Sequence, residues 1–366
     1  MDGTLLKSRS MRTVGAIVGK DLAESVKNKD ILMVFGTIAF LIALYFYLPQ
    51  LSVSGEVQRV RLYEAGGSAV AERLEPAASL RVFSYESEQA MLDDLAIASY
   101  DSGELGLVVP AGADQVIAAG GPLRLEGYLM HWVTPRNAET IRTSTERRLS
   151  QQLGVPVTLT LAPRRIDSRP DSMGHSLFSA NALTLIFVLT GIMMAPRLIM
   201  EERENRTLDA LLVSPARYSH IVLGKALTAL CFSLLTSAAV VAVNRGIIVQ
   251  WWLLALAAVW GTLFSVAVGL LLGLLFENKQ QLTLWLMVIM QPLLIPVFLN
   301  VMVDLIPPAV IRVFQFVPPV ALSNVIRYAL TPSAPFSAWA ADFALVVVST
   351  VGLLAAAVWV VRRTDR

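Results

Sequence analysis

The sequence predicts an all-α membrane protein with six transmembrane helices and a separate α+β domain inserted between the first two. Hydrophobic residues make up 55% of the chain and charged residues only 16%, which is more apolar than ordinary globular domains. The apolar residues form segments long enough to cross a bilayer, which takes about 20 residues. One long stretch interrupts them with the alternation and turn signals of a soluble domain. The small net charge of +2 indicates no nucleic-acid partner.

The predicted boundaries follow the chain in order. Residues 1–30 form an N-terminal segment, and the six spans cover 31–49, 177–200, 219–243, 249–276, 282–303 and 341–361. The inserted domain covers 50–176, the loop after the second span 201–218, a proline-broken segment 304–340, and the tail 362–366. We interpret the first span as an uncleaved anchor, because its apolar core is longer than that of a signal peptide and thirty residues precede it.

The N-terminal segment carries a predicted helix that lies in the plane of the membrane. Its apolar face comprises Val14, Ile17, Val18, Leu22 and Val26, whereas Lys20, Asp21, Glu24 and Lys27 lie largely elsewhere. This separation is typical of helices at the membrane interface. The stretch GAIVGKD at 15–21 is not a phosphate-binding loop, because three rather than four residues separate its glycines and Asp21 stands where Ser or Thr should be.

Basic residues predict the orientation in a cell membrane. Six lysines and arginines precede the first span, the 197–218 region carries four arginines and the tail three, whereas the opposite connections hold only Arg245, Arg312 and Arg327. By the positive-inside rule, both termini and the 201–218 loop face the cytoplasm. Residues 50–176 are then extracytoplasmic.

The inserted segment alternates between predicted strands and helices. Alternating stretches predict strands at 57–63, 80–85, 103–110, 123–133 and 155–166. Helical spacing covers 87–99 and 134–154, where Thr134 and Pro135 supply an N-cap and a first-turn residue. His131 and Trp132 could belong to a binding site, but no carboxylate lies at ligand spacing, so we expect packed strand residues.

The loop EERENRTLDALLVSPARYSHIVLGKAL, residues 201–227, holds the most specific pattern in the chain. Leu208, Leu211 and Leu212 fall at i, i+3 and i+4, so a short helix would carry one apolar stripe, with Thr207 as N-cap and Asp209 in its first turn. The charges of Glu202, Arg203 and Glu204 precede it. On spacing alone, this helix could equally rest on lipid headgroups or dock on a protein.

This loop resembles the signature loop of permease subunits of type-2 ABC exporters, and its Glu-Asn-Arg-Thr form is closest to the branch labelled sodium-efflux or multidrug permeases. The resemblance implies that the loop is a coupling helix in a groove of a cytosolic ATPase. The residues it assigns to coupling are Glu202, Arg203, Glu204, Thr207, Leu208, Asp209, Leu211 and Leu212. It also implies two ATPase subunits, a second permease copy or paralogue, and re-entrant helices within 304–340.

No phosphate-binding loop and no catalytic constellation stands out in this chain, so we expect a transport subunit and not an enzyme. Such a subunit binds no cofactor or metal itself, while ATP and Mg bind to the partner ATPase. The competing class is a non-transporting receptor or scaffold with a ligand-binding ectodomain. The proline-broken segment and the polar residues inside spans favour the exporter.

Two features inside the spans have alternative explanations. Gly261, Ser265, Gly269 and Gly273 recur every four residues in the fourth span, which predicts close helix packing either within the chain or across a dimer. Gln291, just before Pro292, is either a helix-to-helix hydrogen-bonding residue or a cavity-lining one. Lys225 lies near the end of its span, and we expect its side chain to extend toward the membrane surface.

Overall fold

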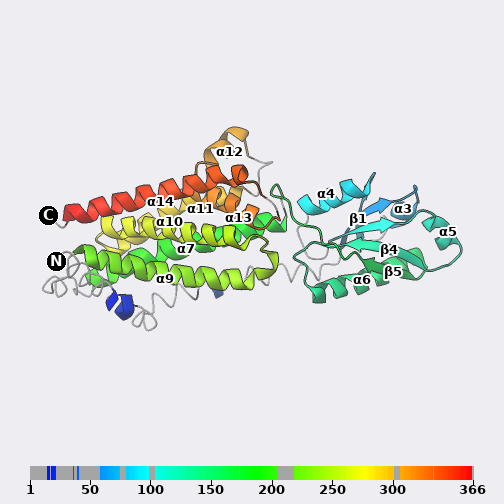
Figure 1. The fold of residues 1–366 in the computed structure, drawn as a ribbon, viewed down its shortest axis with the longest axis horizontal. Coiled ribbons are helices and arrows are strands. Elements are labelled where there is room, and N and C mark those ends of the chain that lie inside the picture. Colours follow the sequence, from blue (N-terminus) through cyan, green and yellow to red (C-terminus); the bar gives the residue numbers. More distant parts are fainter. Residues whose placement is uncertain are drawn as a thin grey trace.

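The computed structural model describes residues 15–16, 18–21, 36, 39–40, 58–74, 80–98, 104–172, 174–204, 218–300, 306–332 and 334–364. They form a sheet domain (residues 58–172) and a helical bundle (residues 174–364), which lie end to end along the long axis of the molecule (Figure 1). The predicted first span, 31–49, lies almost entirely outside the described residues.

The sheet domain contains five strands in the order β2-β1-β3-β4-β5. They are β1 (Gln58–Glu64), β2 (Leu80–Tyr85), β3 (Leu105–Val109), β4 (Leu123–Tyr128) and β5 (Val157–Leu161). Neighbouring strands are parallel except for the antiparallel pair β3–β4. In β4, buried and exposed residues alternate through LRLEGY, as expected for a strand with one face covered.

Four helices accompany the sheet, namely α3 (Val70–Leu74), α4 (Glu88–Ala98), α5 (Ala113–Ala118) and α6 (Pro135–Leu153). The predicted N-terminus of α6 is present, because the Thr134 side chain accepts a hydrogen bond from the Asn137 amide and Pro135 opens the first turn. Gly154 ends the helix at φ 70°, a left-handed conformation that glycine adopts without strain.

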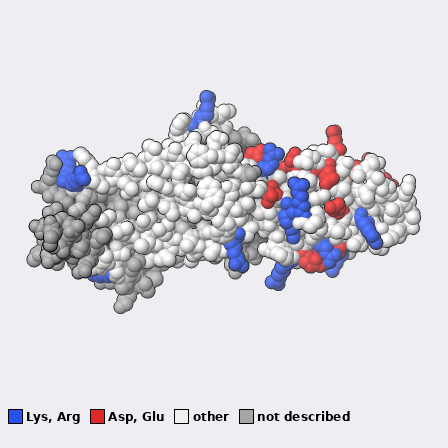
Figure 2. Space-filling model, viewed as in Figure 1, with Lys and Arg blue, Asp and Glu red and all other residues white. Residues whose placement is uncertain are grey.

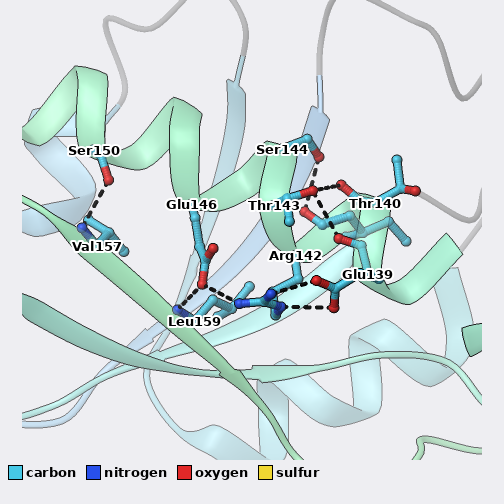
Figure 3. Close-up of polar contacts among 10 residues, drawn as sticks. Glu139, Thr140, Arg142, Thr143, Ser144, Glu146, Ser150, Val157 and Leu159 are labelled. Carbon is cyan, nitrogen blue, oxygen red and sulfur yellow. Dashed lines mark hydrogen bonds and ion pairs between the residues drawn. The ribbon is translucent and has the colours of Figure 1, made fainter. Parts of the chain in front are cut away.

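Helix α6 covers the free edge of the sheet as well as part of one face. The Val157 amide donates to Ser150 Oγ at 2.9 Å, and the Leu159 amide donates to Glu146 Oε1 at 2.8 Å (Figure 3). Arg142 donates to the same Glu146 oxygen at 3.0 Å and holds the carboxylate in place. Because these β5 amides bond to α6, this edge is not open to another strand.

A charged cluster joins β1 to α4 and to Glu104, the residue before β3. Arg61, only 4% exposed, donates to Asp94 Oδ2 and to Glu104 Oε2, both at 2.6 Å. The Tyr85 hydroxyl donates to the same Asp94 oxygen at 2.6 Å. Burial, together with this hydrogen bond, raises the pKa of Tyr85 to about 12.

Among the described residues, five helices of the bundle are long and apolar enough to cross a membrane. They are α7 (His175–Glu204), α9 (Tyr218–Val243), α10 (Trp251–Leu275), α11 (Lys279–Leu299) and α14 (Phe336–Thr364). The short η1 (Arg245–Ile247) links α9 to α10. The visible face of the bundle carries almost no charged side chains along its middle, whereas the sheet domain carries many (Figure 2).

The proline-broken segment folds into α12 (Pro308–Phe314) and α13 (Pro318–Ala329), which are bent by 87° to one another. Prolines stand at the first positions of both helices, where the missing N–H is tolerated. Such a pair is either a broken span or a re-entrant hairpin. Counted as one span, it brings the described candidates to six.

Helices α7 and α10 form the centre of the bundle. In their most apolar windows, 72% of the residues of each are buried, against 17% in α11 and 22% in α14. Buried residues of α7, α10 and α13 make up most of one apolar core. The bundle therefore has a densely packed interior, flanked by helices with large open faces.

Candidate functional site

The two ends of the predicted coupling loop lie at the end of the bundle away from the sheet domain. Helix α7 begins beside that domain, where the rings of His175 and Trp132 lie 4.2 Å apart, and its 30 residues extend about 45 Å. It ends at Glu204, and α9 begins nearby at Tyr218 (Figure 1).

The loop itself, residues 205–217, lies outside the described residues. Helix α7 includes the backbone of Glu202, Arg203 and Glu204, but the structure does not describe their side chains. The assignment of Thr207, Leu208, Asp209, Leu211 and Leu212 to coupling therefore stays a prediction. What the structure adds is the position of the two helix ends that flank the loop, Glu204 of α7 and Tyr218 of α9, at the end of the bundle away from the sheet domain.

A buried ion pair lies near the start of α9. Lys225 Nζ is 2.9 Å from Asp21 Oδ1, and the side chains are only 3% and 4% exposed. The sequence analysis expected the Lys225 side chain to extend toward the membrane surface, whereas the structure shows it enclosed by the protein and paired with Asp21. An unpaired lysine would be costly at this depth, and the carboxylate from the N-terminal segment compensates its charge.

The four small residues of α10 lie against helices of the same chain. A Cβ added at Gly269 would come within 2.8 Å of the Gly191 carbonyl oxygen, and one at Gly273 within 3.0 Å of the Pro196 Cα. Gly261 lies against Leu322 of α13, and Ser265 lies against Gly191 of α7. The spacing thus lets the α7 and α10 backbones approach closely.

Gln291 is exposed on α11, which has few buried residues of its own. Within the part of the chain that the structure describes, its side chain makes no hydrogen bond to another helix. The Asn278 side chain caps the same helix by accepting from the Gln280 amide at 2.8 Å. The choice between hydrogen bonding and cavity lining for Gln291 depends on what covers this face.

The sheet domain meets the bundle through residues that the sequence placed in a strand. Strand β4 ends at Tyr128, so His131 and Trp132 lie in the turn that follows and not in the predicted strand 123–133. His131 Nε2 lies 3.4 Å from the Ile247 carbonyl oxygen, and Arg327 donates to the Ser172 carbonyl at 3.0 Å. These contacts fasten the two domains together.

A buried polar contact that the sequence analysis missed joins three helices. Ser323 Oγ of α13 donates to Asn181 Oδ1 at 2.5 Å, and Asn181 Nδ2 of α7 donates to the Val297 carbonyl of α11 at 3.1 Å. The sequence did contain an indication of this contact. Asn181 lies near the start of an apolar span, and an amide side chain inside a membrane needs a hydrogen-bond partner.

Comparison with known families decides the class of the protein. A family described as ABC-2 family transporter protein matches residues 29–359. The chain belongs to this ABC-2 transporter family. None of the curated proteins searched matches it.

Membership in the ABC-2 family makes this chain a multi-pass membrane protein and a transport subunit of an ABC transporter. Permeases of this family work with an ABC ATPase subunit. The match begins before the predicted first span and ends within α14, so it covers the sheet domain and the described helices of the bundle except the last five residues of α14. Among the residues the structure describes, no group of three or more His, Cys, Asp or Glu side chains could hold a metal ion.

Proposed function

We propose that this ABC-2 protein is the permease subunit of an exporter, with the loop 201–218 carrying the coupling helix that docks on a cytosolic ATPase. The observation that carries the proposal is the loop sequence, placed between α7 and α9 at the end of the bundle opposite the sheet domain. An ATPase bound there would push on the ends of two long helices at once.

The orientation follows from the basic residues. Both termini and the coupling loop would face the cytoplasm, and the sheet domain would be extracytoplasmic, because lysine and arginine collect at the loop end of the bundle. The helix count agrees with this arrangement if residues 31–49 form the first of six spans and α12–α13 a re-entrant hairpin.

The proposed mechanism uses ATP and Mg bound by the partner. Closure of two ATPase subunits on ATP would displace the docked loop, and the attached α7 and α9 would tilt to open a path between this chain and a second permease copy or paralogue. Leu208, Leu211 and Leu212 would supply the apolar face that docks in the ATPase groove.

The cargo class is broader than the branch label suggests. The Glu-Asn-Arg-Thr form resembles the sodium-efflux and multidrug branch, but the spans offer no carboxylate cluster for an ion path. A largely apolar interior suits lipids and drug-like amphiphiles as substrates. Peptides and ions are the other candidate substrates to test.

Affinity isolation from the native membrane tests the proposal. The parent should co-purify with a phosphate-binding-loop ATPase, and Leu208→Glu with Leu211→Glu should lose it, because charges would enter the apolar docking face. Ala210→Glu is the matched control, since position 210 lies on the opposite side of the same predicted helix. If gentle extraction recovers no ATPase with the parent, the receptor or scaffold alternative replaces the exporter.

A further inference from the structure

A small polar cavity opens at the end of the bundle that meets the sheet domain. It has a volume of about 270 Å³ and lies among the end of α11, the α12–α13 pair and the start of α14, next to Pro170 of the sheet domain. Its polar lining residues are Asn300, Gln315, Asn324, Arg327, Tyr328 and Asp342. This volume is slightly below the usual range of small-molecule pockets and suits a headgroup-sized ligand.

Two opposite charges line this cavity without pairing to one another. Arg327 donates one N–H to the Ser172 carbonyl at 3.0 Å, and its Nε is buried without a hydrogen-bond partner within the described structure. Asp342, on the neighbouring helix, is half-buried and hydrogen-bonded to Asn324. Both groups keep hydrogen-bonding capacity for a ligand, and leaving buried polar atoms unpaired costs free energy.

Aromatic side chains near the cavity indicate its depth in the membrane. Trp339 packs edge-on against Phe336 at 4.8 Å and against Trp252 at 5.6 Å between ring centroids. Tryptophan is enriched at the membrane–water interface, and Trp252 is 54% exposed. Asp342 lies three residues from Trp339, about 4.5 Å along the helix, which favours a position of the cavity at headgroup level.

We propose that this cavity binds the headgroup of a zwitterionic phospholipid, with the phosphate on Arg327 and the ammonium group on Asp342. A guanidinium presents several N–H groups in a plane that matches phosphate oxygens. The carboxylate accepts from a primary ammonium group, which a headgroup without an amine lacks. The site would tie a lipid to the helices that adjoin the sheet domain, and it does not depend on the export proposal.

Lipid titration of the purified full-length protein tests this inference. Delipidated protein in detergent is titrated calorimetrically with short-chain phosphatidylethanolamine, short-chain phosphatidylglycerol and soluble phosphoethanolamine. The ethanolamine lipid should bind about tenfold more tightly than the glycerol lipid, as one hydrogen-bonded charge contact contributes. Phosphoethanolamine without acyl chains should bind more weakly than the ethanolamine lipid.

Three variants separate the two charges. Asp342→Asn keeps the shape of the side chain and should abolish the preference for ethanolamine. Arg327→Gln should weaken both lipids, and Arg312→Gln, which removes an exposed charge from the same helix pair outside the cavity lining, should change neither.

Two results would overturn the proposal. The first is an equal affinity for the two lipids in the parent, or a preference that persists in Asp342→Asn, because either would mean that Asp342 does not bind an ammonium group. The second is phosphoethanolamine binding as tightly as its lipid, which would assign the site to a soluble phosphoamine. Because Asp342→Asn leaves the contact between Arg327 and Ser172 in place, the test remains decisive even if Arg327→Gln disturbs the domain junction.

Discussion

Removing one partner of the Lys225–Asp21 pair should destabilise the bundle far more than removing both. In Lys225→Met, the buried Asp21 carboxylate would lose the ammonium group 2.9 Å away, and in Asp21→Leu the buried Lys225 ammonium group would lose that carboxylate. Both side chains are at least 96% buried, since their exposed fractions are 3% and 4%. Water therefore screens and replaces the lost interaction very little.

The magnitude follows from this burial and from the 2.9 Å separation of the two atoms. Breaking a buried pair on one side costs about 3–5 kcal/mol, whereas replacing both members by apolar residues of similar size is neutral or stabilising. The double variant Asp21→Leu with Lys225→Met should therefore unfold close to the parent. Because each single variant should cost about 3–5 kcal/mol and the double variant almost nothing, the coupling free energy of the cycle should be about 6–10 kcal/mol, well above the additive limit.

Tryptophan fluorescence during unfolding in mixed detergent micelles measures this difference. Six of the seven tryptophans belong to the bundle, and only Trp132 lies in the sheet domain, so the signal reports mainly on the bundle. His220→Gln, a change in the same helix that leaves the ion pair intact, serves as a control for substitution in the first turns of α9.

Additive single and double variants would refute the reasoning. So would single variants that unfold at the same denaturant concentration as the parent, because an exposed pair contributes only about 0–1 kcal/mol. Either result would mean that Asp21 does not compensate the Lys225 charge in the membrane protein.

Two further predictions concern the helix contact and the sheet domain. Gly269→Ala should destabilise the bundle by about 1–3 kcal/mol, because the added Cβ would lie 2.8 Å from the Gly191 carbonyl oxygen. Gly352→Ala is the control and should stabilise the bundle slightly, because no atom lies within 4 Å of its added Cβ. Unfolding of both variants in the same micelles measures the difference. The neutral hydroxyl of Tyr85 is favoured in the folded state, so its stabilising effect is complete below pH 10 and declines as pH rises toward its raised pKa of about 12. Calorimetry of the full chain between pH 9 and 12 should show this decline, smaller in Tyr85→Phe because the hydroxyl that bonds Asp94 is gone.

The sequence predicted elements whose signals are local. Alternation located all five strands, and Thr134 and Pro135 located the start of α6. Helices α3 and α5 were missed because five and six residues are too few to show a helical period. The strand predicted at 123–133 was too long, since apolar residues continue into the turn that contacts the bundle.

Contacts between distant residues could not be predicted in the same way. Asp21 and Lys225 are 204 positions apart, and each alone fits a surface residue of an amphipathic or terminal helical segment. Composition shows that a polar group in an apolar span needs a partner, but it does not show which one. The coupling residues differ from Asp21 and Lys225 in this respect. Their pattern is strong in the sequence, but the structure does not describe their side chains.

Helix α7, which has Pro196 in its interior, connects the proposed coupling loop to the sheet domain as one continuous helix. Its first residue, His175, packs on Trp132, and its last turn enters the loop about 45 Å away. Between these ends, the close approach of Gly191 and Gly269 leaves no room for α7 to slide along α10 without displacing backbone atoms. A force applied at the loop would therefore move α7 and α10 together and reach the sheet domain. Helix α11 has only 17% of its apolar window buried, so a change of its packing partners would cost less free energy than a change between α7 and α10.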